Sequence, residues 1–569
     1  MVRTAVTGIS PPLRGGRGSS RLPVWVVAAA IVLTAAVRLR LADVPLERDE
    51  GEYAYAGQLL LHGTPPYVLA YNMKFPGVYY ANAAILAAFG STPRAVRLGL
   101  LLVNAASIVL VFALGRRLLG PAAAAAAAAT FALLSLDRWV LGVFAHATHF
   151  VILFALAGLL VLLRGMESGR RAGFLAAGVL LGISVLMKQQ GGAFVVLAAG
   201  LLLALPAAPG PRGGSGRVPR LLALAAGVLV PGVLLLGVLA VQGVLGRFWF
   251  WTVTYASAYA AEVPWSEAGT WFTLGWGTAT RVTRPFWGIA AAGFAALWMV
   301  PHDRRTRVFV TGLVVASGAA VCPGLYFREH YFILLLPAVA LLCGVAWKVA
   351  TDLAGHAVSR QAAAGIATLA LALPAGFYFA SEWEPLVSMT PREFSRARFG
   401  PNPFIEAEEI AAYLRDHTDP GDRIAVVGSE PEIYFLADRA SATGYIYTYG
   451  LVEPQPYARR MQEEMRAEIE AAAPAYLVYV QVALSWLPAP GADPGIFEWV
   501  QHHTAACYDL VGIAEVRSQE ETVYAWDEAV AGYEIRAPNV VFTYRRNRGG
   551  ACPDPGSPDA APIAALVTR

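Results

Sequence analysis

Charged residues are scarce in this sequence of 569 residues. Asp, Glu, Lys and Arg make up 15% of the chain, whereas hydrophobic residues make up 56%. A soluble globular protein carries about 25% charged residues, so the composition argues against a soluble enzyme and indicates a protein embedded in a bilayer. The net charge of +4 is small for this length, and the basic residues lie in short loop clusters. We therefore expect no nucleic-acid partner.

Cysteine is also scarce, with four residues in the chain, which excludes a disulfide scaffold. Cys322 and Cys343 fall in apolar segments, where a small buried hydrophobe is the simplest interpretation. Cys507 and Cys552 lie in the polar C-terminal part. If that part lies outside the cytoplasm the two can form a disulfide, but the sequence does not give their distance.

Acidic residues are almost absent from a series of long apolar runs. Runs of about 17–25 residues are long enough to cross a bilayer as helices, and we expect about eleven. The first follows a basic stretch and ends in Arg38 and Arg40, so it is interpreted as a retained anchor and not as a cleaved signal peptide. The expected spans lie near residues 22–42, 95–115, 120–136, 139–163, 172–188, 191–207, 220–244, 285–301, 307–327, 331–350 and 361–381.

Basic residues in alternate loops orient these spans. Lys and Arg concentrate in cytoplasmic loops of membrane proteins, and here they follow the second, fourth, sixth, eighth and tenth runs. The residues are Arg116, Arg117, Arg164, Arg170, Arg171, Arg212, Arg217, Arg220, Arg304, Arg305, Arg307, Lys348 and Arg360. This pattern predicts a cytoplasmic N-terminus and an extracytoplasmic C-terminal part.

The chain divides into four predicted regions. Residues 1–21 form a basic cytoplasmic tail, and residues 22–381 form a transmembrane domain with a long outer loop at 43–94. That loop contains two stretches with helical spacing, interpreted as helices on the membrane surface. Residues 382–545 alternate strand and helix patterns, which indicates an extracytoplasmic α/β domain. Residues 546–569 are rich in Pro, Gly and Ala and are expected to be disordered.

Polar clusters fall on the predicted outer side. Asp49 and Glu50 lie in ERDEGEYAYAG just after the first span, where they are either a solvated loop of charges or groups for acid–base chemistry. Lys74, in YNMKFPG of the same loop, either snorkels to water or binds a lipid phosphate.

Three further outer clusters lie at helix ends. His146 and His149 in FAHATHF are spaced by three and are either a buried hydrogen-bonded pair or part of a metal site, although two ligands do not complete one. Lys188 and Gln189 lie in the polar turn MKQQGG. Arg328, His330 and Tyr331 lie in YFREHYF, and a guanidinium with an imidazole beside an apolar helix suits the phosphate of a lipid.

The distribution of these clusters indicates one polar site that faces outward. A transporter is expected to carry polar residues within its spans, and few are found there. The alternatives left open are a lipid or glycan transporter or flippase, an outer-face binding or assembly protein without chemistry, and a ligase that moves a finished glycan.

The motifs RDEGEYAYAG, KFPG and REHYFILLLPAVALL resemble bacterial glycosyltransferase family 39. Its wider set includes protein O-mannosyltransferases, lipid A aminoarabinose transferases and the lipopolysaccharide-sugar transferases of rhizobia. The resemblance covers roughly residues 22–350 and implies the GT-C fold in a bacterial cell membrane.

The resemblance also implies an activity and a site. It implies an inverting transferase that moves a sugar from a polyprenyl-phosphate donor to a lipid, glycan or protein acceptor. Asp49 would be the general base, accompanied by Glu50. Lys74, Arg328, His330 and Lys188 would bind the donor phosphate, while His146, His149, Gln189 and Tyr331 would form a further polar site. No cofactor is implied with certainty. Many relatives carry an acid where this chain has His149, so whether a divalent metal is bound stays open.

Overall fold

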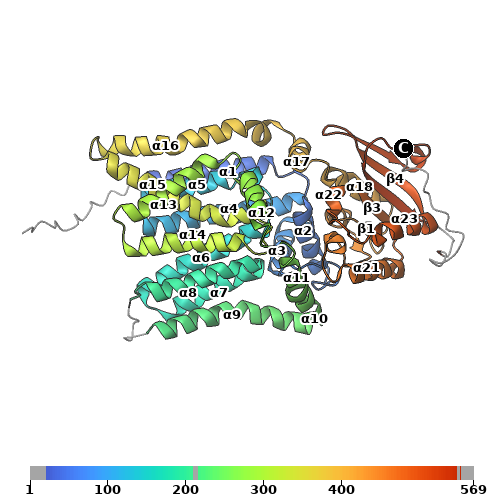
Figure 1. Cartoon of the computed structure of the whole chain (residues 1–569), viewed down its shortest axis with the longest axis horizontal. Helices are drawn as coiled ribbons and strands as arrows, with labels where there is room; N and C mark the ends of the chain where they lie inside the picture. Colours follow the sequence, from blue (N-terminus) through green and yellow to red (C-terminus); the bar gives the residue numbers. More distant parts are fainter. Residues whose placement is uncertain (1–20, 209–215, 548–551, 553–569) are drawn as a thin grey trace, which may run out of the picture.

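The computed structural model describes residues 21–208, 216–547 and 552. The chain forms a long helical bundle with an α/β domain at one end (Figure 1). Two predicted regions lie mostly outside the described residues. They are the basic N-terminal tail, residues 1–21, and the tail expected to be disordered, residues 546–569. Arg546, which was placed in that tail, is instead the last residue of a strand and pairs with Tyr508 of the neighbouring strand.

The bundle contains a helix in each of the eleven predicted spans. Six helices in the described part are long and apolar enough to cross a membrane, and one of them is continuous over Glu329–Ala354. The protein is thus a multi-pass membrane protein, and the crossing of all eleven helices stays a prediction. The helices are α1 (Leu22–Arg40), α4 (Pro93–Leu118), α5 (Pro121–Leu134), α6 (Ala147–Ser168), α7 (Arg171–Met187), α8 (Gly192–Ala204), α9 (Arg217–Val241), α13 (Arg284–Met299), α14 (Arg304–Val321), α15 (Leu336–Ala354) and α16 (Arg360–Ser381).

The predicted start of the fourth span was wrong. Residues 139–146 do not continue a helix, and α6 begins only at Ala147. The side chain of Asp137 caps the 3-10 turn η1 (Arg138–Val140), and Leu141 then adopts a left-handed conformation with φ 58°. The chain therefore turns at this point, and His146 becomes the N-cap residue of α6.

The two helices of the outer loop are α2 (Arg48–Leu61) and α3 (Gly77–Phe89). A capping box starts α2, since the side chains of Glu47 and Glu50 each accept a backbone N–H of the other residue. Gly57 lets α3 approach α2 closely, because a Cβ there would lie 2.8 Å from the backbone nitrogen of Ala83. Almost every residue of α2 is buried, so this helix lies inside the protein and not on a membrane surface.

The aromatic outer segment lies between α9 and α13. It consists of α10 (Leu245–Trp249), the π-helix η3 (Phe250–Tyr255), α11 (Ala256–Ala260) and α12 (Ala268–Ala279). Trp251 and Tyr255 are buried, whereas Trp249 and Trp265 are exposed, as is common for aromatic residues at a membrane interface.

The C-terminal domain is built on one six-stranded sheet with the strand order β2-β1-β3-β6-β4-β5. The parallel pairs β1–β2 and β1–β3 belong to the predicted α/β part. The antiparallel strands β4, β5 and β6 extend the sheet and were not predicted. The elements are α17 (Pro391–Phe399), α18 (Phe404–Asp416), β1 (Arg423–Val427), α19 (Glu432–Ala437), β2 (Ala440–Ser441), α20 (Tyr449–Val452), α21 (Ala458–Ala472), β3 (Tyr476–Gln481), α22 (Ala483–Trp486), α23 (Gly495–Cys507), β4 (Tyr508–Val516), β5 (Thr522–Trp526) and β6 (Asn539–Arg546).

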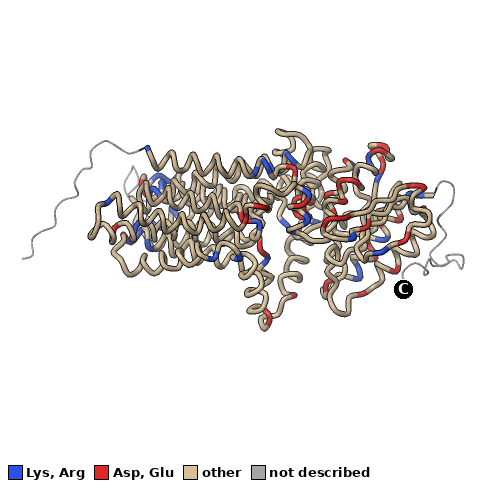
Figure 2. Tube along the Cα trace, turned by 90° about the horizontal axis from the view of Figure 1, so that it is seen from above, with Lys and Arg blue, Asp and Glu red and all other residues tan. Residues whose placement is uncertain are grey.

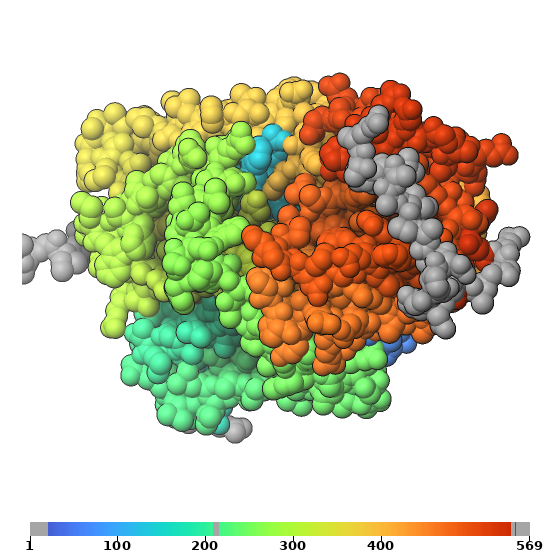
Figure 3. Space-filling model, turned by 45° about the vertical axis from the view of Figure 1, so that its right-hand side comes forward, coloured from blue at the N-terminus to red at the C-terminus, as the bar shows by residue number. Residues whose placement is uncertain are grey.

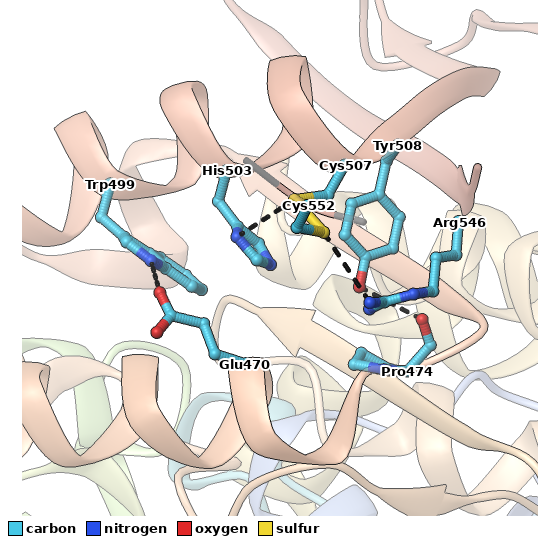
Figure 4. Close-up of a disulfide and its surroundings, with 8 residues drawn as sticks. All are labelled: Glu470, Pro474, Trp499, His503, Cys507, Tyr508, Arg546 and Cys552. Atoms are coloured by element: carbon cyan, nitrogen blue, oxygen red, sulfur yellow. Dashed lines mark hydrogen bonds between the residues drawn. A yellow bond between two sulfur atoms is a disulfide. The ribbon is translucent and has the colours of Figure 1, made fainter. Parts of the chain in front are cut away.

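Cys507 and Cys552 form a disulfide with a Cα–Cα distance of 5.1 Å (Figure 4). The bridge joins the end of α23 to the segment that follows β6. His503 lies 3.8 Å from the Cys507 sulfur, and Arg546 donates to the Cys552 sulfur at 3.7 Å. Cys343 is buried, in agreement with the sequence, whereas Cys322 is exposed.

Candidate active site

A cavity of about 590 Å³ lies where the bundle meets the C-terminal domain. Figure 3 shows this domain packed against the bundle as a cap at one end of the molecule. Eight of the ten predicted site residues line the cavity, namely Asp49, Lys74, His146, Lys188, Gln189, Arg328, His330 and Tyr331. They come from α2, the loop before α3, the start of α6, the turn after α7 and the 3-10 helix η4 (Glu329–Leu335), which leads into α15.

Asp49 lies in the first turn of α2 with both carboxylate oxygens in contact with other side chains. Its Oδ1 accepts hydrogen bonds from Lys74 Nζ at 2.8 Å and from the Tyr447 hydroxyl at 2.6 Å. Its Oδ2 lies 3.2 Å from His146 Nδ1. Burial alone would raise the pKa of Asp49, but the Lys74 ammonium and His146 outweigh burial and hold the pKa well below its usual range. Asp49 is therefore an ionised carboxylate.

Lys74 is bound to two carboxylates. Besides Asp49 it contacts Glu52 Oε2 at 2.5 Å, and Tyr79 donates to the other Glu52 oxygen at 2.6 Å. Burial opposes the charged form of Lys74, but Asp49 and Glu52 raise its pKa well above the ordinary value. Lys74 is thus a permanent cation, and its charge offsets the negative charges of Asp49 and Glu52.

Lys188 and Arg328 are cations of another kind. In the described part of the chain neither forms an ion pair with a carboxylate. Lys188 lies 3.3 Å from His330 Nε2 and 4.2 Å from the ring centre of Tyr331. Arg328 hydrogen-bonds Tyr259 and lies 5.1 Å from the ring centre of Tyr326. Burial lowers the pKa of Lys188 to about 7. Two such cations beside one cavity can bind an anionic group.

His146 and His330 stack with ring centres 4.3 Å apart and planes parallel within 1°. Each offers one ring nitrogen and Asp49 offers one oxygen, and these three atoms lie within 4.8 Å of one another. The ring nitrogens of His146 are buried and make no hydrogen bond of good geometry. This donor set suits a zinc-type cation, but the parallel stack has to open before both imidazoles can point at one ion.

Glu50 and His149 lie away from the cavity. Glu50 is fully buried, pairs with Arg97 at 2.8 Å and accepts the backbone N–H of Ala145 at 2.6 Å. It therefore ties α2 to α4 and to the start of α6 rather than meeting a substrate. His149 is buried within α6. It follows the N-cap residue His146 by three positions and, unlike His146, does not line the cavity.

The C-terminal domain supplies a wall of the cavity that the sequence did not predict. Tyr447, Tyr449 and Glu453 line it. Tyr255 donates to Glu453 at 3.2 Å, and burial raises the pKa of Glu453 to about 7. The sequence feature that could have indicated this wall is GYIYTYG, in which Tyr445, Tyr447 and Tyr449 place three phenols at alternate positions of one short stretch.

Known proteins share this architecture. The structure is similar to ArnT from Cupriavidus metallidurans bound to undecaprenyl phosphate, with a TM-score of 0.57, 16% identity and coverage of 81% of this chain and 94% of that chain. It is also similar to the oligosaccharyltransferase AglB from Archaeoglobus fulgidus in complex with an inhibitory peptide and a dolichol-phosphate, with a TM-score of 0.51, 13% identity and coverage of 90% and 75%.

The protein has the GT-C fold. Within this GT-C chain, residues 73–234 match the family model of the dolichyl-phosphate-mannose-protein mannosyltransferases. No curated protein sequence matches the chain. The GT-C fold and the helical membrane domain expected from the sequence are thus confirmed.

Proposed function

We propose that the protein is an inverting glycosyltransferase that moves one sugar from a polyprenyl-phosphate donor to an acceptor hydroxyl. One observation carries this proposal. The ionised carboxylate of Asp49 and the unpaired cations Lys188 and Arg328 line the same cavity. A phosphate-linked sugar needs both a base for the acceptor and cations for the leaving group. The match to a family of dolichyl-phosphate-dependent transferases, and the lipid phosphates bound by ArnT and AglB, support the same donor class.

Each cavity residue has a separate role in the proposed reaction. Arg328 and Lys188 bind the donor phosphate, with His330 beside Lys188. The acceptor hydroxyl gives its proton to Asp49 as its oxygen attacks the anomeric carbon. The bond between that carbon and the phosphate oxygen breaks, and polyprenyl phosphate leaves with the electron pair. The phosphate is a good leaving group, so the protein has to supply positioning and one base.

Oδ2 is the Asp49 oxygen that takes the proton. Oδ1 already accepts two hydrogen bonds, from Lys74 and Tyr447. Among the described residues Oδ2 has a close polar contact with His146, at 3.2 Å, and this contact is not a hydrogen bond of good geometry. An incoming hydroxyl can therefore find a free lone pair on Oδ2.

The orientation in the membrane follows from the charge pattern. Basic residues gather at the end of the bundle far from the C-terminal domain, while charges of both signs surround that domain (Figure 2). The basic end is cytoplasmic by the positive-inside rule, so the cavity faces the extracytoplasmic side of a bacterial cell membrane. A donor whose tail lies in the bilayer reaches the cavity from the side.

A transfer assay tests the proposal. Purified protein in vesicles is supplied with radiolabelled polyprenyl-phosphate pentoses, hexoses and amino sugars, and release of sugar from the lipid is measured. We expect one donor to be consumed by the native protein and not by Asp49→Asn. Asp43→Asn is the matched control, since Asp43 lies in the same loop and is exposed, with Arg94 as its ion-pair partner at 3.9 Å.

Two outcomes would contradict the proposal. Equal consumption by the native protein and Asp49→Asn would remove Asp49 as the base. Movement of the lipid across the vesicle membrane with no sugar released from any donor would favour the transporter instead.

A further inference from the structure

The catalytic carboxylate is held by a residue that lies far away in the sequence. The Tyr447 hydroxyl donates to Asp49 Oδ1 at 2.6 Å across a separation of 398 residues. Its ring also faces Lys74, whose Nζ lies 5.2 Å from the ring centre. Tyr447 therefore contacts both members of the Asp49–Lys74 pair from the side of the C-terminal domain.

Tyr447 belongs to a firmly anchored stretch, residues 443–453, which we name the cover segment. Before Tyr447, the hydroxyl of Thr443 and the backbone N–H of Gly444 both donate to Glu468, at 2.6 and 2.9 Å. After it, the backbone N–H of Thr448 donates to the Ser429 hydroxyl at 2.9 Å, and the Tyr449 hydroxyl donates to the Leu484 carbonyl at 3.1 Å. The position of Tyr447 is thus fixed by its own domain.

The cover segment is fitted against the membrane domain. The backbone N–H of Tyr71 donates to the Gly444 carbonyl at 2.7 Å. A Cβ at Gly444 would lie 2.2 Å from the Tyr71 ring, and a Cβ at Gly450 would lie 2.5 Å from the Tyr255 hydroxyl. Glycine at these two positions lets the backbone approach rings of the membrane domain more closely than any other residue would allow.

The residue before Asp49 is held by the same domain. Arg48 pairs with Glu430 at 3.0 Å, donates to the Ser429 carbonyl and bonds the Asn402 side chain at 3.1 Å. The start of α2 is therefore fastened to the C-terminal domain on both sides of the carboxylate, through Arg48 and through Tyr447.

We propose that Tyr447 is a positioning residue for Asp49, so that the C-terminal domain completes the active site. Together with Lys74, Tyr447 occupies Oδ1 and turns Oδ2 toward the place of the acceptor hydroxyl. The gain is geometric, because a base already held in the attacking orientation has no further rotational freedom to lose on reaching the transition state. This inference rests on the proposed function and adds to it a task for the C-terminal domain.

The variant Tyr447→Phe removes the hydroxyl and keeps the ring over Lys74. We expect kcat to fall about tenfold or more, since a hydrogen bond to a charged group is lost, while the donor KM and the binding of the donor lipid stay unchanged. Tyr533→Phe is the matched control. It removes a tyrosine–carboxylate hydrogen bond of the same length, 2.6 Å to Glu515, from the same domain but outside the cavity.

Retention of the native kcat by Tyr447→Phe would overturn the inference. Loss of donor binding together with kcat would also overturn it, because Tyr447 would then act on the substrate or on folding and not on the orientation of Asp49.

A second measurement is independent of turnover. A water-soluble carbodiimide is applied at one fixed pH, and modification of the Asp49 peptide is followed by mass spectrometry. We expect faster modification of Asp49 in Tyr447→Phe than in the native protein and in Tyr533→Phe, because Oδ1 has lost a partner. Equal rates in all three would overturn the inference. This result stands even if the native protein consumes no donor, so failure of the inference and failure of the proposed function are distinguishable.

Discussion

Lys188 and Asp49 are both partly buried at the cavity, and burial opposes the charge of each, yet only Asp49 has a nearby opposite charge that outweighs it. Asp49 has Lys74 within 2.8 Å and keeps its charge, whereas Lys188 forms no ion pair with a carboxylate of the described residues and its pKa falls to about 7. An anionic ligand beside Lys188 would stabilise the charged ammonium, because the ligand would supply the counter-charge that Lys188 lacks.

Donor binding should therefore weaken as the pH rises. A phosphodiester keeps its negative charge throughout this range, while Lys188 in the free protein is charged below about pH 7 and neutral above it. Affinity should be full below pH 7 and fall above it, until the pH passes the higher pKa that Lys188 has beside the phosphate. Glu47 and Glu453, with pKa values raised to about 7 by burial, ionise over the same range and act in the same direction.

Two variants show how much of this pH dependence of donor binding is due to Lys188. Lys188→Arg stays charged and should bind donor lipid at pH 8 better than the native protein does. Lys188→Gln should bind about tenfold more weakly at pH 6. Titration with a fluorescent polyprenyl phosphodiester measures both, and an identical pH profile in all three proteins would exclude Lys188 from the phosphate site.

Zinc should inhibit the enzyme. Asp49 already has Lys74 and Tyr447 as partners, so the proposed reaction needs no ion. A zinc ion bound by Asp49, His146 and His330 would occupy the lone pair that the acceptor proton requires. We expect a chelator to leave turnover unchanged and micromolar zinc to reduce it, with weaker inhibition in His330→Asn. Loss of activity on chelation, restored by a metal, would instead make the ion part of the mechanism.

At the scale of elements, α2 is the helix on which the site depends. It lies between the bundle and the C-terminal domain, and Gly51 is one of the positions where the two parts approach each other closely. A Cβ at Gly51 would lie 2.7 Å from both the backbone nitrogen and the Cβ of Glu432 in α19.

Gly51→Ala should therefore destabilise the protein by about 1–3 kcal/mol, the usual cost of overpacking, and should also lower activity by moving Asp49. Gly200→Ala in α8 is the control, since nothing lies within 4 Å of the Cβ it would add. Thermal unfolding in detergent measures both. Equal midpoints for the two variants would show that α2 and α19 are free to separate.

Sequence patterns were informative where one helix or strand sufficed. The apolar runs predicted the eleven bundle helices, and the helical spacing in the outer loop predicted α2, although Asp49, expected in the loop before it, lies in the first turn of this helix. The sequence patterns did not predict contacts between residues that are far apart in the sequence. Nothing local shows that Glu50 binds Arg97, that Lys74 is neutralised by Glu52, or that Tyr447 lies beside Asp49. Charge type alone could not separate the paired cation Lys74 from the unpaired cations Lys188 and Arg328.

At the scale of the whole molecule, the orientation in the membrane decides which substrates reach the cavity. Ser91 lies beside the outer end of α3, and Ser168 ends α6 at the opposite, basic end of the bundle; both are exposed. In a Cys322→Ser background, a membrane-impermeant maleimide should label Ser91→Cys in intact cells. Ser168→Cys should react only after permeabilisation. The reverse pattern would place the active site in the cytoplasm and contradict the proposed donor.

The position of a bound lipid phosphate tests the central claim most directly. A cryo-electron microscopy structure of the native protein with polyprenyl phosphate should show the phosphate within hydrogen-bonding distance of Arg328 and Lys188, with Asp49 Oδ2 open beside it. A second such structure of Arg328→Gln should show weak or no density there. A phosphate bound elsewhere, for example between α1, α5 and α16 where an apolar groove of about 470 Å³ lies, would contradict the assignment of this cavity as the active site.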